Sequence, residues 1–301
     1  MARILYLSAG GLFDRRFLVK TREAGHELLY VHLLENEGGH VPAGVPSVSL
    51  GYLPLFGSGW FTILRRVVSK VVPMIRFLRL LWDYRPDILH ASWLPTVGFW
   101  AALSGFHPLI LTIFGTDVRI RARQSRVIRW VVRYALRRAD AILCDNQYTA
   151  QAVYAHVPET RRKMLVFPFG VEQGRFKPDD GRRRERRTEW GWETNFICLM
   201  ARSPEPLYRV DLFLRAFKKV VQHCPDARAL VTGTGSQEAV LRSLCTELGL
   251  DGTVRFLGMV PREDLPGVFN SADLYVSFPE DDGSSISLLE ALSSRLPVVV
   301  P

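Results

Sequence analysis

The sequence predicts an α/β protein with two Rossmann-like domains, the second of which is incomplete. Short apolar runs bounded by turn-forming residues alternate with amphipathic stretches, and this alternation stops in one polar segment and then restarts. A length of 301 residues is enough for about two domains. Strands that alternate with helices predict parallel sheets covered on both faces.

The first predicted domain covers residues 1–178. Its expected strands are the apolar runs RILYLSA, HELLYVHL, DILHAS, LILTIF, AILC and MLVFPF. Helices are expected after a glycine turn near residue 10, over 60–82 and over 124–138. Residues 91–116 carry no Asp, Glu, Lys or Arg and are long enough to cross a bilayer. Pro95, Gly105 and Pro108 divide them, however, which favours a buried helix followed by a strand.

A polar segment over 179–194, rich in arginine and without apolar periodicity, is predicted to be a linker. The second predicted domain covers 195–301, with strands NFICLM, ARALVTG, TVRFLG and DLYVSF and helices over about 210–224, 237–248, 262–270 and 285–294. The closing apolar run LPVVV ends the sequence at Pro301 in the middle of a strand. For this reason we expect the second domain to be incomplete.

The formal charge of +9 and the isoelectric point near 9.6 favour an anionic partner. The sequence has no homeodomain, zinc-finger or RRM pattern, so we expect no nucleic-acid partner. The four cysteines are far apart and form no C-x-x-C pair, which favours reduced thiols and no metal site. With no signal peptide at the N-terminus, a cytoplasmic location is expected.

Residues 60–82 mix tryptophan and phenylalanine with arginine and lysine. Such a helix can lie on an anionic membrane surface, which would make the protein peripheral on the inner membrane face. The same residues can also simply pack against the sheet. The sequence leaves both interpretations open.

The sharpest chemical signal is the pair Asp282 and Glu290, separated by seven residues, in a strand–loop–helix context. Ser284 or Ser285 is expected to cap this helix, and its free N–H groups would lie at the carboxyl edge of a parallel sheet, where phosphates bind. Carboxylates accept hydrogen bonds from sugar hydroxyls. The pattern therefore suits a diphosphate between two hydroxylated rings. From spacing alone, a loop aspartate and a helix-surface glutamate without a role is the more common explanation.

This stretch resembles the acid-x7-acid signature of the family-four retaining glycosyltransferases of the GT-B fold, in which a helix reading LLEAMA and a strand reading LPVV follow. Here LLEALSSRLPVVV stands in those places. Four further segments are similar to that family in order and spacing: SAGG with AGHEL, FPFGVEQGRFKP, PDARALVTGTG, and GTVRFLGMVPREDLPGVFNSADLYVSFPE.

The resemblance implies catalytic roles for Asp282, Glu290 and Arg202. Asp282 would lie near the donor sugar, Glu290 would bind the nucleotide ribose, and Arg202 would neutralise the diphosphate, because a guanidinium offers paired donors and a permanent charge. The remaining donor-binding candidates are glycines that leave the backbone open, amides of the loop, and one more arginine: Gly10, Gly11, Arg209, Gly283, Ser284 and Ser285.

The sequence departs from the family pattern at three places. Tyr208 and Arg209 stand where a lysine is usual, so Arg209 is the candidate for that charge. Phe114 replaces a histidine of the first domain, and His90 is expected to be structural. Asp117 could face the acceptor, although a capping aspartate explains it equally well. Segments that continue the second domain in the family are absent after Pro301.

The resemblance implies an active site in the cleft between the domains, where a sugar passes from a nucleotide-diphosphate donor to a hydroxyl of a saccharide or lipid-linked acceptor with retained configuration. The nucleotide sugar would be a co-substrate, and no cofactor or metal is expected. Two alternatives remain: a sugar-nucleotide epimerase of the same architecture, and a truncated, inactive binding protein. A dinucleotide oxidoreductase is disfavoured, because no G-x-G-x-x-G follows the first strand.

Overall fold

The structure, a computed structural model, describes residues 1–10, 14–33, 41–51 and 60–301, with the backbone alone for 60–70. The chain forms two compact units, Met1–Pro168 and Phe169–Pro301. Each unit is built on its own parallel sheet, so the predicted α/β architecture with two Rossmann-like domains is confirmed.

The first unit carries a seven-stranded sheet in the order β3-β2-β1-β4-β5-β6-β7, with parallel pairing throughout. Its strands are β1 (Arg3–Ser8), β2 (Glu27–His32), β3 (Ser47–Ser49), β4 (Ile88–Ser92), β5 (Leu109–Ile113), β6 (Ala141–Cys144) and β7 (Met164–Val166). Its helices are α1 (Asp14–Glu23), α2 (Trp60–Tyr84), α3 (Phe99–Leu103), α4 (Ala122–Gln124), α5 (Arg126–Arg138) and α6 (Gln147–His156), with shorter helical segments η2 (Leu94–Gly98), η3 (Asp117–Arg121) and η4 (Pro158–Lys163).

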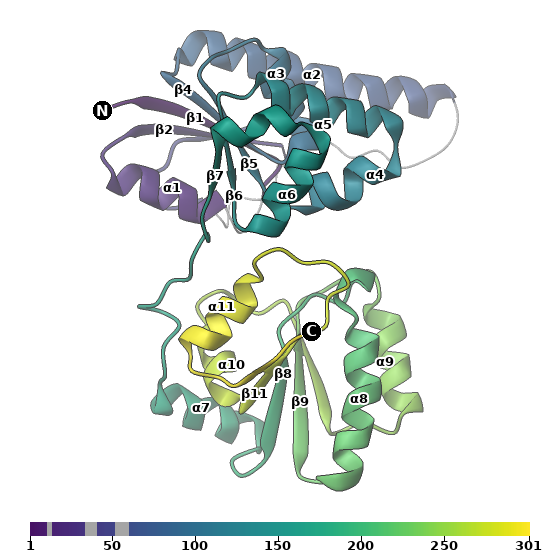
Figure 1. Cartoon of the computed structure of the whole chain (residues 1–301). Helices are drawn as coiled ribbons and strands as arrows, with labels where there is room; N and C mark the ends of the chain where they lie inside the picture. The colour runs from purple at the N-terminus through teal and green to yellow at the C-terminus, as the bar shows by residue number, and fades with distance from the viewer. Residues whose placement is uncertain (11–13, 34–40, 52–59) are drawn as a thin grey trace. The chain divides into compact units, whose positions relative to one another are not determined.

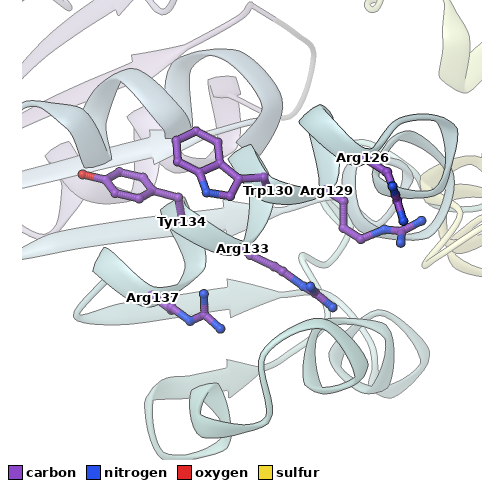
Figure 2. A pocket seen from close by; sticks show the side chains of 6 residues that line it. All are labelled: Arg126, Arg129, Trp130, Arg133, Tyr134 and Arg137. Carbon is purple, nitrogen blue, oxygen red and sulfur yellow. The ribbon is translucent and has the colours of Figure 1, made fainter.

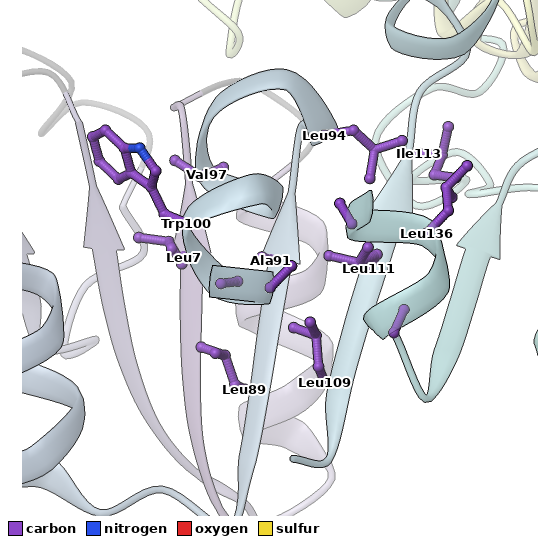
Figure 3. Close-up of a cluster of buried hydrophobic side chains, with 14 of the residues drawn as sticks. Leu7, Leu89, Ala91, Leu94, Val97, Trp100, Leu109, Leu111, Ile113 and Leu136 are labelled. Carbon is purple, nitrogen blue, oxygen red and sulfur yellow. The ribbon is translucent and has the colours of Figure 1, made fainter. Parts of the chain in front are cut away.

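Helices α2, α3 and α5 cover one face of this sheet, and α1 covers the other (Figure 1). Figure 3 shows the core on the first face, where strand side chains such as Leu7 and Leu111 meet Trp100 of α3 and Leu136 of α5. On the opposite face, Leu18 of α1 belongs to a separate cluster with side chains of β1 and β2. The apolar run over 91–116 thus forms η2, α3 and β5, as predicted. Within the described residues no helix is both long and apolar enough to cross a membrane.

The second unit carries a five-stranded parallel sheet in the order β10-β9-β8-β11-β12. Its strands are β8 (Phe196–Met200), β9 (Ala227–Thr232), β10 (Val254–Gly258), β11 (Leu274–Val276) and β12 (Val298–Val299). Its helices are α7 (Asp180–Trp190), α8 (Val210–His223), α9 (Glu238–Glu247), α10 (Leu265–Ser271) and α11 (Ile286–Ser293), with the short turn η5 (Pro206–Tyr208). Helices α8 and α9 pack in one core cluster, and α10 and α11 pack in another.

The segment predicted as a linker over 179–194 is a helix instead, and the division between the units falls at Pro168, before the expected position. Asp179 caps α7 by accepting from Arg182 N at 3.0 Å, and Gly191 ends it with a φ of 68°. Arg183 and Arg187 reach Asp273 at 2.5 Å each. Long-range ion pairs therefore stabilise α7 against the rest of the second unit, although this segment has no apolar face.

Asp273 is the hub of this attachment, because its carboxylate also accepts from Ile197 N at 2.8 Å. The substitution Asp273→Ala leaves the largely buried Arg187 without its ionic partner, so we expect it to lower the free energy of unfolding of the second unit by about 3–5 kcal/mol. Urea unfolding followed by circular dichroism measures this change. The matched control is Arg184→Ala in the same helix, since the Arg184 side chain has no ion pair among the described residues. An equal effect of both substitutions would contradict the assignment.

Candidate functional site

Three loops of the second unit meet at one edge of its sheet. Strands β9, β8 and β11 are neighbours and parallel, so their carboxyl ends lie side by side. The loops that follow them cover 201–209, 233–237 and 277–285. Residues that are about 80 positions apart in the sequence are brought together here.

Arg202 lies at the centre of this edge. Its guanidinium donates to Asp282 Oδ2 at 2.5 Å and to Ser285 Oγ at 2.5 Å, and it lies over the Tyr208 ring at 4.0 Å from the ring centre. The side chain is 8% exposed, and its Nε has no hydrogen-bond acceptor among the described residues. The structure thus brings the three predicted site residues Arg202, Asp282 and Ser285 together. The buried Arg202 keeps one N–H group, at Nε, that has no acceptor among the described residues.

The start of α11 is the second component of the site. Ser285 caps the helix, and its Oγ accepts from Leu288 N at 3.3 Å, so the predicted cap is confirmed at Ser285. In the described part of the chain, the N–H groups of Ile286 and Ser287 have no acceptor, as the first turn of a helix requires. These donors and the positive end of the helix make this point attractive to an anion.

Glu290 lies within α11 and is 5% exposed, rather than on the helix surface. Gly283 and Ser284 occupy the loop before the helix, and Gly283 N donates to Asp282 Oδ1 at 2.9 Å. The Gly283 N–H is therefore directed toward the carboxylate of the preceding residue, Asp282. The predicted donor-binding roles of Glu290, Gly283 and Ser284 stay predictions.

Two glycines allow the loops after β8 and β9 to approach each other closely. A Cβ atom on Gly235 would be 2.4 Å from the Pro204 carbonyl oxygen, and one on Gly233 would be 3.0 Å from Ser203. Glu205 fastens the contact, because its carboxylate accepts from Ser236 N at 2.8 Å and from Ser236 Oγ at 2.6 Å. These two hydrogen bonds are the main cause of a lowered pKa of Glu205.

Arg209 is placed differently from Arg202. Its Nε donates to Asp211 at 3.2 Å and its guanidinium reaches Glu280 at 3.1 Å, and these pairs raise its pKa. Two carboxylates share this charge at the exposed rim of the site. The role of Arg209 toward a donor stays a prediction.

The sequence interpretation missed the hydroxyl group that links these parts. Ser287 Oγ lies 2.7 Å from Tyr275 OH, 3.1 Å from Ser285 Oγ and 3.4 Å from the Arg202 guanidinium. The sequence could have indicated Ser287, because it lies two residues after the cap Ser285, and side chains in the first turn of a helix lie close to the capping residue. Tyr208 was noted only as the replacement of a lysine, and its stacking on Arg202 has no sequence signature.

In the first unit, the predicted glycine turn follows β1. Gly10 has a φ of 97°, a conformation that favours glycine, and its N–H donates to Ser8 Oγ at 3.0 Å. Ser8 Oγ in turn donates to the buried carboxylate of Asp14, which also accepts from Tyr6 and Tyr30 at 2.9 Å each. The prediction for Gly11 lies outside the described residues.

Asp117 is fully buried at the start of η3. It accepts from Gly115 N and Val118 N at 3.1 Å each and from Leu94 N at 3.5 Å, so it ties the loop after β5 to the loop after β4. Burial raises its pKa from 3.8 to about 6. Asp117 therefore holds the two loops together without being the N-cap of η3, which is Thr116, and a role toward the acceptor stays a prediction.

His90 is buried on β4, where its Nε2 lies 2.7 Å from Thr112 Oγ1 and its ring meets Tyr6 edge-on at 4.6 Å. Burial lowers its pKa from 6.5 to about 3, so the ring stays neutral. The structural role expected for His90 fits this environment. Among the described residues, no group of three or more His, Cys, Asp or Glu side chains is arranged to hold a metal ion.

The close approach at Gly235 gives a test of loop packing. The substitution Gly235→Ala puts a methyl group against a backbone carbonyl, so we expect a loss of about 1–3 kcal/mol in the free energy of unfolding of the second unit. Gly174→Ala is the matched control, because a Cβ there meets no atom within 4 Å and its φ is not positive. Thermal and urea unfolding of the two variants compare them. Equal stabilities would show that the loops rearrange freely.

The raised pKa of Asp117 gives a pH-dependent test. Because the folded chain holds the Asp117 proton more tightly than the unfolded chain does, this group makes the free energy of unfolding fall as the pH rises from about 4 to about 6. We expect Asp117→Asn, which cannot ionise, to gain stability relative to wild type over that range, by up to about 3 kcal/mol. Urea unfolding at several pH values measures this difference. A difference that does not change with pH would contradict the raised pKa.

Two family models match successive parts of the chain. The model described as glycosyl transferase 4-like matches residues 60–146, and the model described as glycosyl transferases group 1 matches residues 182–301. The second match contains the loop after β8, the loop after β9 and the whole of α11. It therefore covers the edge of the sheet at which Arg202, Asp282 and Ser285 meet.

Curated relatives are glycosyltransferases. A GDP-mannose-dependent alpha-(1-6)-phosphatidylinositol monomannoside mannosyltransferase of Mycolicibacterium smegmatis is 28% identical over 182 residues, which are 56% of this chain and 47% of that protein. A UDP-Gal:alpha-D-GlcNAc-diphosphoundecaprenol alpha-1,3-galactosyltransferase of Escherichia coli is 24% identical over 243 residues, which are 78% of this chain and 62% of that protein. The chain spans less than two thirds of the length of these relatives.

Solved structures of the same fold cover the whole chain. Anabaena HepE in complex with UDP-glucose matches with a TM-score of 0.79 at 19% identity, over all of this chain and 80% of that one. Sucrose-phosphate synthase from Thermosynechococcus elongatus matches with a TM-score of 0.78 at 15% identity, over all of this chain and 81% of that one. The two parallel sheets are thus those of the GT-B fold. Both family models are matched in the expected order, and together with the GT-B fold they support a family-four (GT4-type) glycosyltransferase family for this chain.

Proposed function

We propose that this chain carries out, as part of a GT-B enzyme, the transfer of a sugar from a nucleotide-diphosphate donor to a hydroxyl acceptor, with retained anomeric configuration. One observation carries the proposal: a buried arginine, an aspartate and the start of a helix meet at the carboxyl edge of the second sheet. This is the place in an open parallel sheet where phosphorylated ligands bind. The two glycosyl transferase family models that the chain matches support the class of reaction.

The diphosphate of the donor binds at the start of α11. The N–H groups of Ile286 and Ser287 and the positive end of the helix face its oxygens, and Arg202 adds a fixed positive charge. When the bond to the sugar breaks, negative charge accumulates on the departing diphosphate. Donors that are already in place stabilise that charge without reorganising, which lowers the barrier.

The two acidic residues of the signature bind the hydroxylated parts of the donor. Glu290 accepts hydrogen bonds from the ribose hydroxyls, and Asp282 accepts from the donor sugar. Asp282 now shares Arg202 with Ser285, so donor binding changes the partners of this carboxylate. Arg209, Gly10 and Gly11 complete the donor contacts in this proposal, and Asp117 lies on the acceptor side.

The assignment of roles to domains follows the same scheme. Residues 1–178 would bind the acceptor, and residues 195–301 would bind the nucleotide sugar. The two relatives described above are named for GDP-mannose and UDP-Gal as donors and for lipid-linked acceptors, a phosphatidylinositol monomannoside and a diphosphoundecaprenol-linked sugar. A saccharide or lipid-linked hydroxyl is therefore the proposed acceptor class. The proposed location is the cytoplasm, with peripheral contact to the inner membrane face.

A sugar-nucleotide epimerase would bind the same donor at the same edge. The products separate the two reactions, because transfer releases a nucleoside diphosphate only when an acceptor is present. Epimerisation changes the sugar and needs no acceptor. Chromatography of the nucleotide products with and without acceptor makes this distinction, and the anomeric configuration of the glycoside tests retention.

The role of Arg202 is tested by donor binding. Lysine keeps the charge but loses the paired donors of the guanidinium, so we expect Arg202→Lys to weaken binding of the nucleotide sugar by roughly 10- to 100-fold. Isothermal titration calorimetry with a panel of uridine- and guanosine-diphosphate sugars measures this. Arg215→Lys is the matched control, because Arg215 is an exposed arginine on α8.

Glu290→Gln extends the same test to the ribose contact. Its affinity for the nucleotide sugar should fall while its affinity for inorganic diphosphate stays near that of wild type, because only the former carries ribose. Circular dichroism establishes that each variant is folded. If wild type bound no nucleotide sugar, or if Arg202→Lys and Arg215→Lys bound equally well, the proposed donor site would be wrong.

A further inference from the structure

The positive charge of this protein belongs to one of its two units. Residues 1–168 contain 22 Lys and Arg and 11 Asp and Glu, a formal charge of +11. Residues 169–301 contain 17 and 19, a formal charge of −2. Within the first unit, residues 88–139 hold eight arginines and a single acidic residue, the buried Asp117. An anionic partner is therefore attracted to the first unit.

Four of these arginines share one side of α5. Arg126, Arg129, Arg133 and Arg137 follow one another at intervals of three and four residues, the spacing of neighbours on a helix surface. We call these four residues the arginine face. They line a shallow hollow of about 420 Å³ together with Trp130 and Tyr134, as Figure 2 shows.

The arginine face is poorly neutralised by the protein itself. Among the described residues, Arg137 pairs with Glu159 at 3.2 Å, and the other three arginines have no acidic partner. Arg129 donates to the Ala122 carbonyl at 3.3 Å. The charges on this helix are therefore available to an external anion.

Apolar side chains border the arginine face. Trp130 is 58% exposed and Val127 is 69% exposed on the same helix. Trp130 stacks on Tyr134 at 5.7 Å, and both rings meet Phe99 of α3 edge-on. These contacts hold the tryptophan ring at the surface in a fixed position beside the arginines.

A second apolar surface belongs to the same layer of helices. On α2, Val71, Ile75, Leu78 and Trp82 lie at helical intervals and are all exposed. We call these four residues the apolar stripe. It borders a groove of about 580 Å³ between α2 and the segment after α3, and α3 in turn contacts α5. The apolar stripe and the arginine face therefore lie on the same side of the first sheet, where Figure 1 shows α2, α3 and α5 together.

We propose that this side of the first unit binds the surface of an anionic lipid bilayer, with the arginine face against the headgroups and Trp130 and the apolar stripe at the boundary with the acyl chains. The arginine face extends over twelve residues of helix, about 16 Å from the first to the last at 1.5 Å per residue, which is longer than a single phosphate or diphosphate ligand. Arginine side chains and interfacial tryptophan are the usual components of such surfaces.

A bilayer explains both parts of this surface at once. A nucleic acid would engage the arginines through its phosphates, but it would leave the apolar stripe exposed to water. A bilayer offers negative headgroups and apolar chains over an area as wide as the helix layer. The proposal concerns lipid binding alone, so it does not depend on the proposed transfer reaction.

The test uses the whole chain and vesicles of phosphatidylcholine, with and without phosphatidylglycerol, at physiological ionic strength. Wild type should sediment with the vesicles that contain phosphatidylglycerol and stay in solution with phosphatidylcholine alone. The triple substitution Arg126→Gln, Arg129→Gln and Arg133→Gln should lower the partition coefficient by roughly 100-fold, because each basic side chain near an anionic surface contributes about 1 kcal/mol, or about fivefold.

The control removes the same charge elsewhere. Arg184→Gln, Arg215→Gln and Lys219→Gln take three exposed cations from the second unit and should leave vesicle binding near that of wild type. Trp130→Ala should weaken binding several-fold at unchanged charge. Circular dichroism verifies the folding of each variant, and the tryptophan variant tests the proposal independently should the triple variant not fold.

Three results would overturn the proposal. The first is equal binding of wild type to both kinds of vesicle, and the second is an equal loss of binding in the control and the arginine triple variant. The third is strong binding to duplex DNA with no sedimentation on vesicles, which would make another polyanion the partner. Vesicle binding could still be present if the nucleotide-sugar site were wrong, so the two proposals fail separately.

Discussion

A buried guanidinium organises the carboxyl edge of the sheet in the second unit. Arginine cannot lose its proton in a protein, so burying Arg202 requires acceptors within reach. Asp282 and Ser285 come from the loop between β11 and α11, and the Tyr208 ring comes from the loop after β8 that also carries Arg202. The three loops can meet only because the loop after β9 carries glycine where a Cβ would strike the loop after β8. Arg202 therefore joins the loop after β8 to the loop before α11.

In the first unit, a buried carboxylate, rather than a guanidinium, lies near the carboxyl ends of the strands. The buried Asp14 carboxylate accepts from hydroxyl groups of β1 and β2, and Ser8 connects it to the Gly10 amide and, at 2.8 Å, to Ser92 of β4. Burial and the neighbouring Asp14 raise the pKa of Tyr6 well above its usual value, so this phenol stays a donor. In both units, one charged side chain and several hydroxyls thus fix the carboxyl ends of adjacent parallel strands. Such networks rigidify when every member is satisfied.

Local periodicity was sufficient to predict most of the strands and the longer helices of both units, because these elements have an apolar face. It did not predict β3 or α6. It failed at α7, whose arginines are held by Asp273 almost ninety residues away, so nothing near the helix in sequence indicated it. For the site, the strand–loop–helix pattern was enough to place Asp282 beside the cap at Ser285, whereas Arg202 was indicated only by the resemblance to the glycosyltransferase family. The stacking of Tyr208 and the link through Ser287 depend on side-chain directions, which spacing does not determine.

The formal charge of +9 combines two different uses of arginine. In α7 of the second unit, Arg183, Arg186 and Arg187 are held by Asp273 and Asp264, so their charge is neutralised within the fold. On α5 of the first unit, most arginines have no such partner among the residues that the structure describes. At physiological salt the field of an exposed charge falls off within about 8 Å, so only a surface that comes close to α5 experiences it. The arginine face then determines which side of the unit approaches an anionic surface. The neighbouring apolar side chains determine how tightly that side binds there.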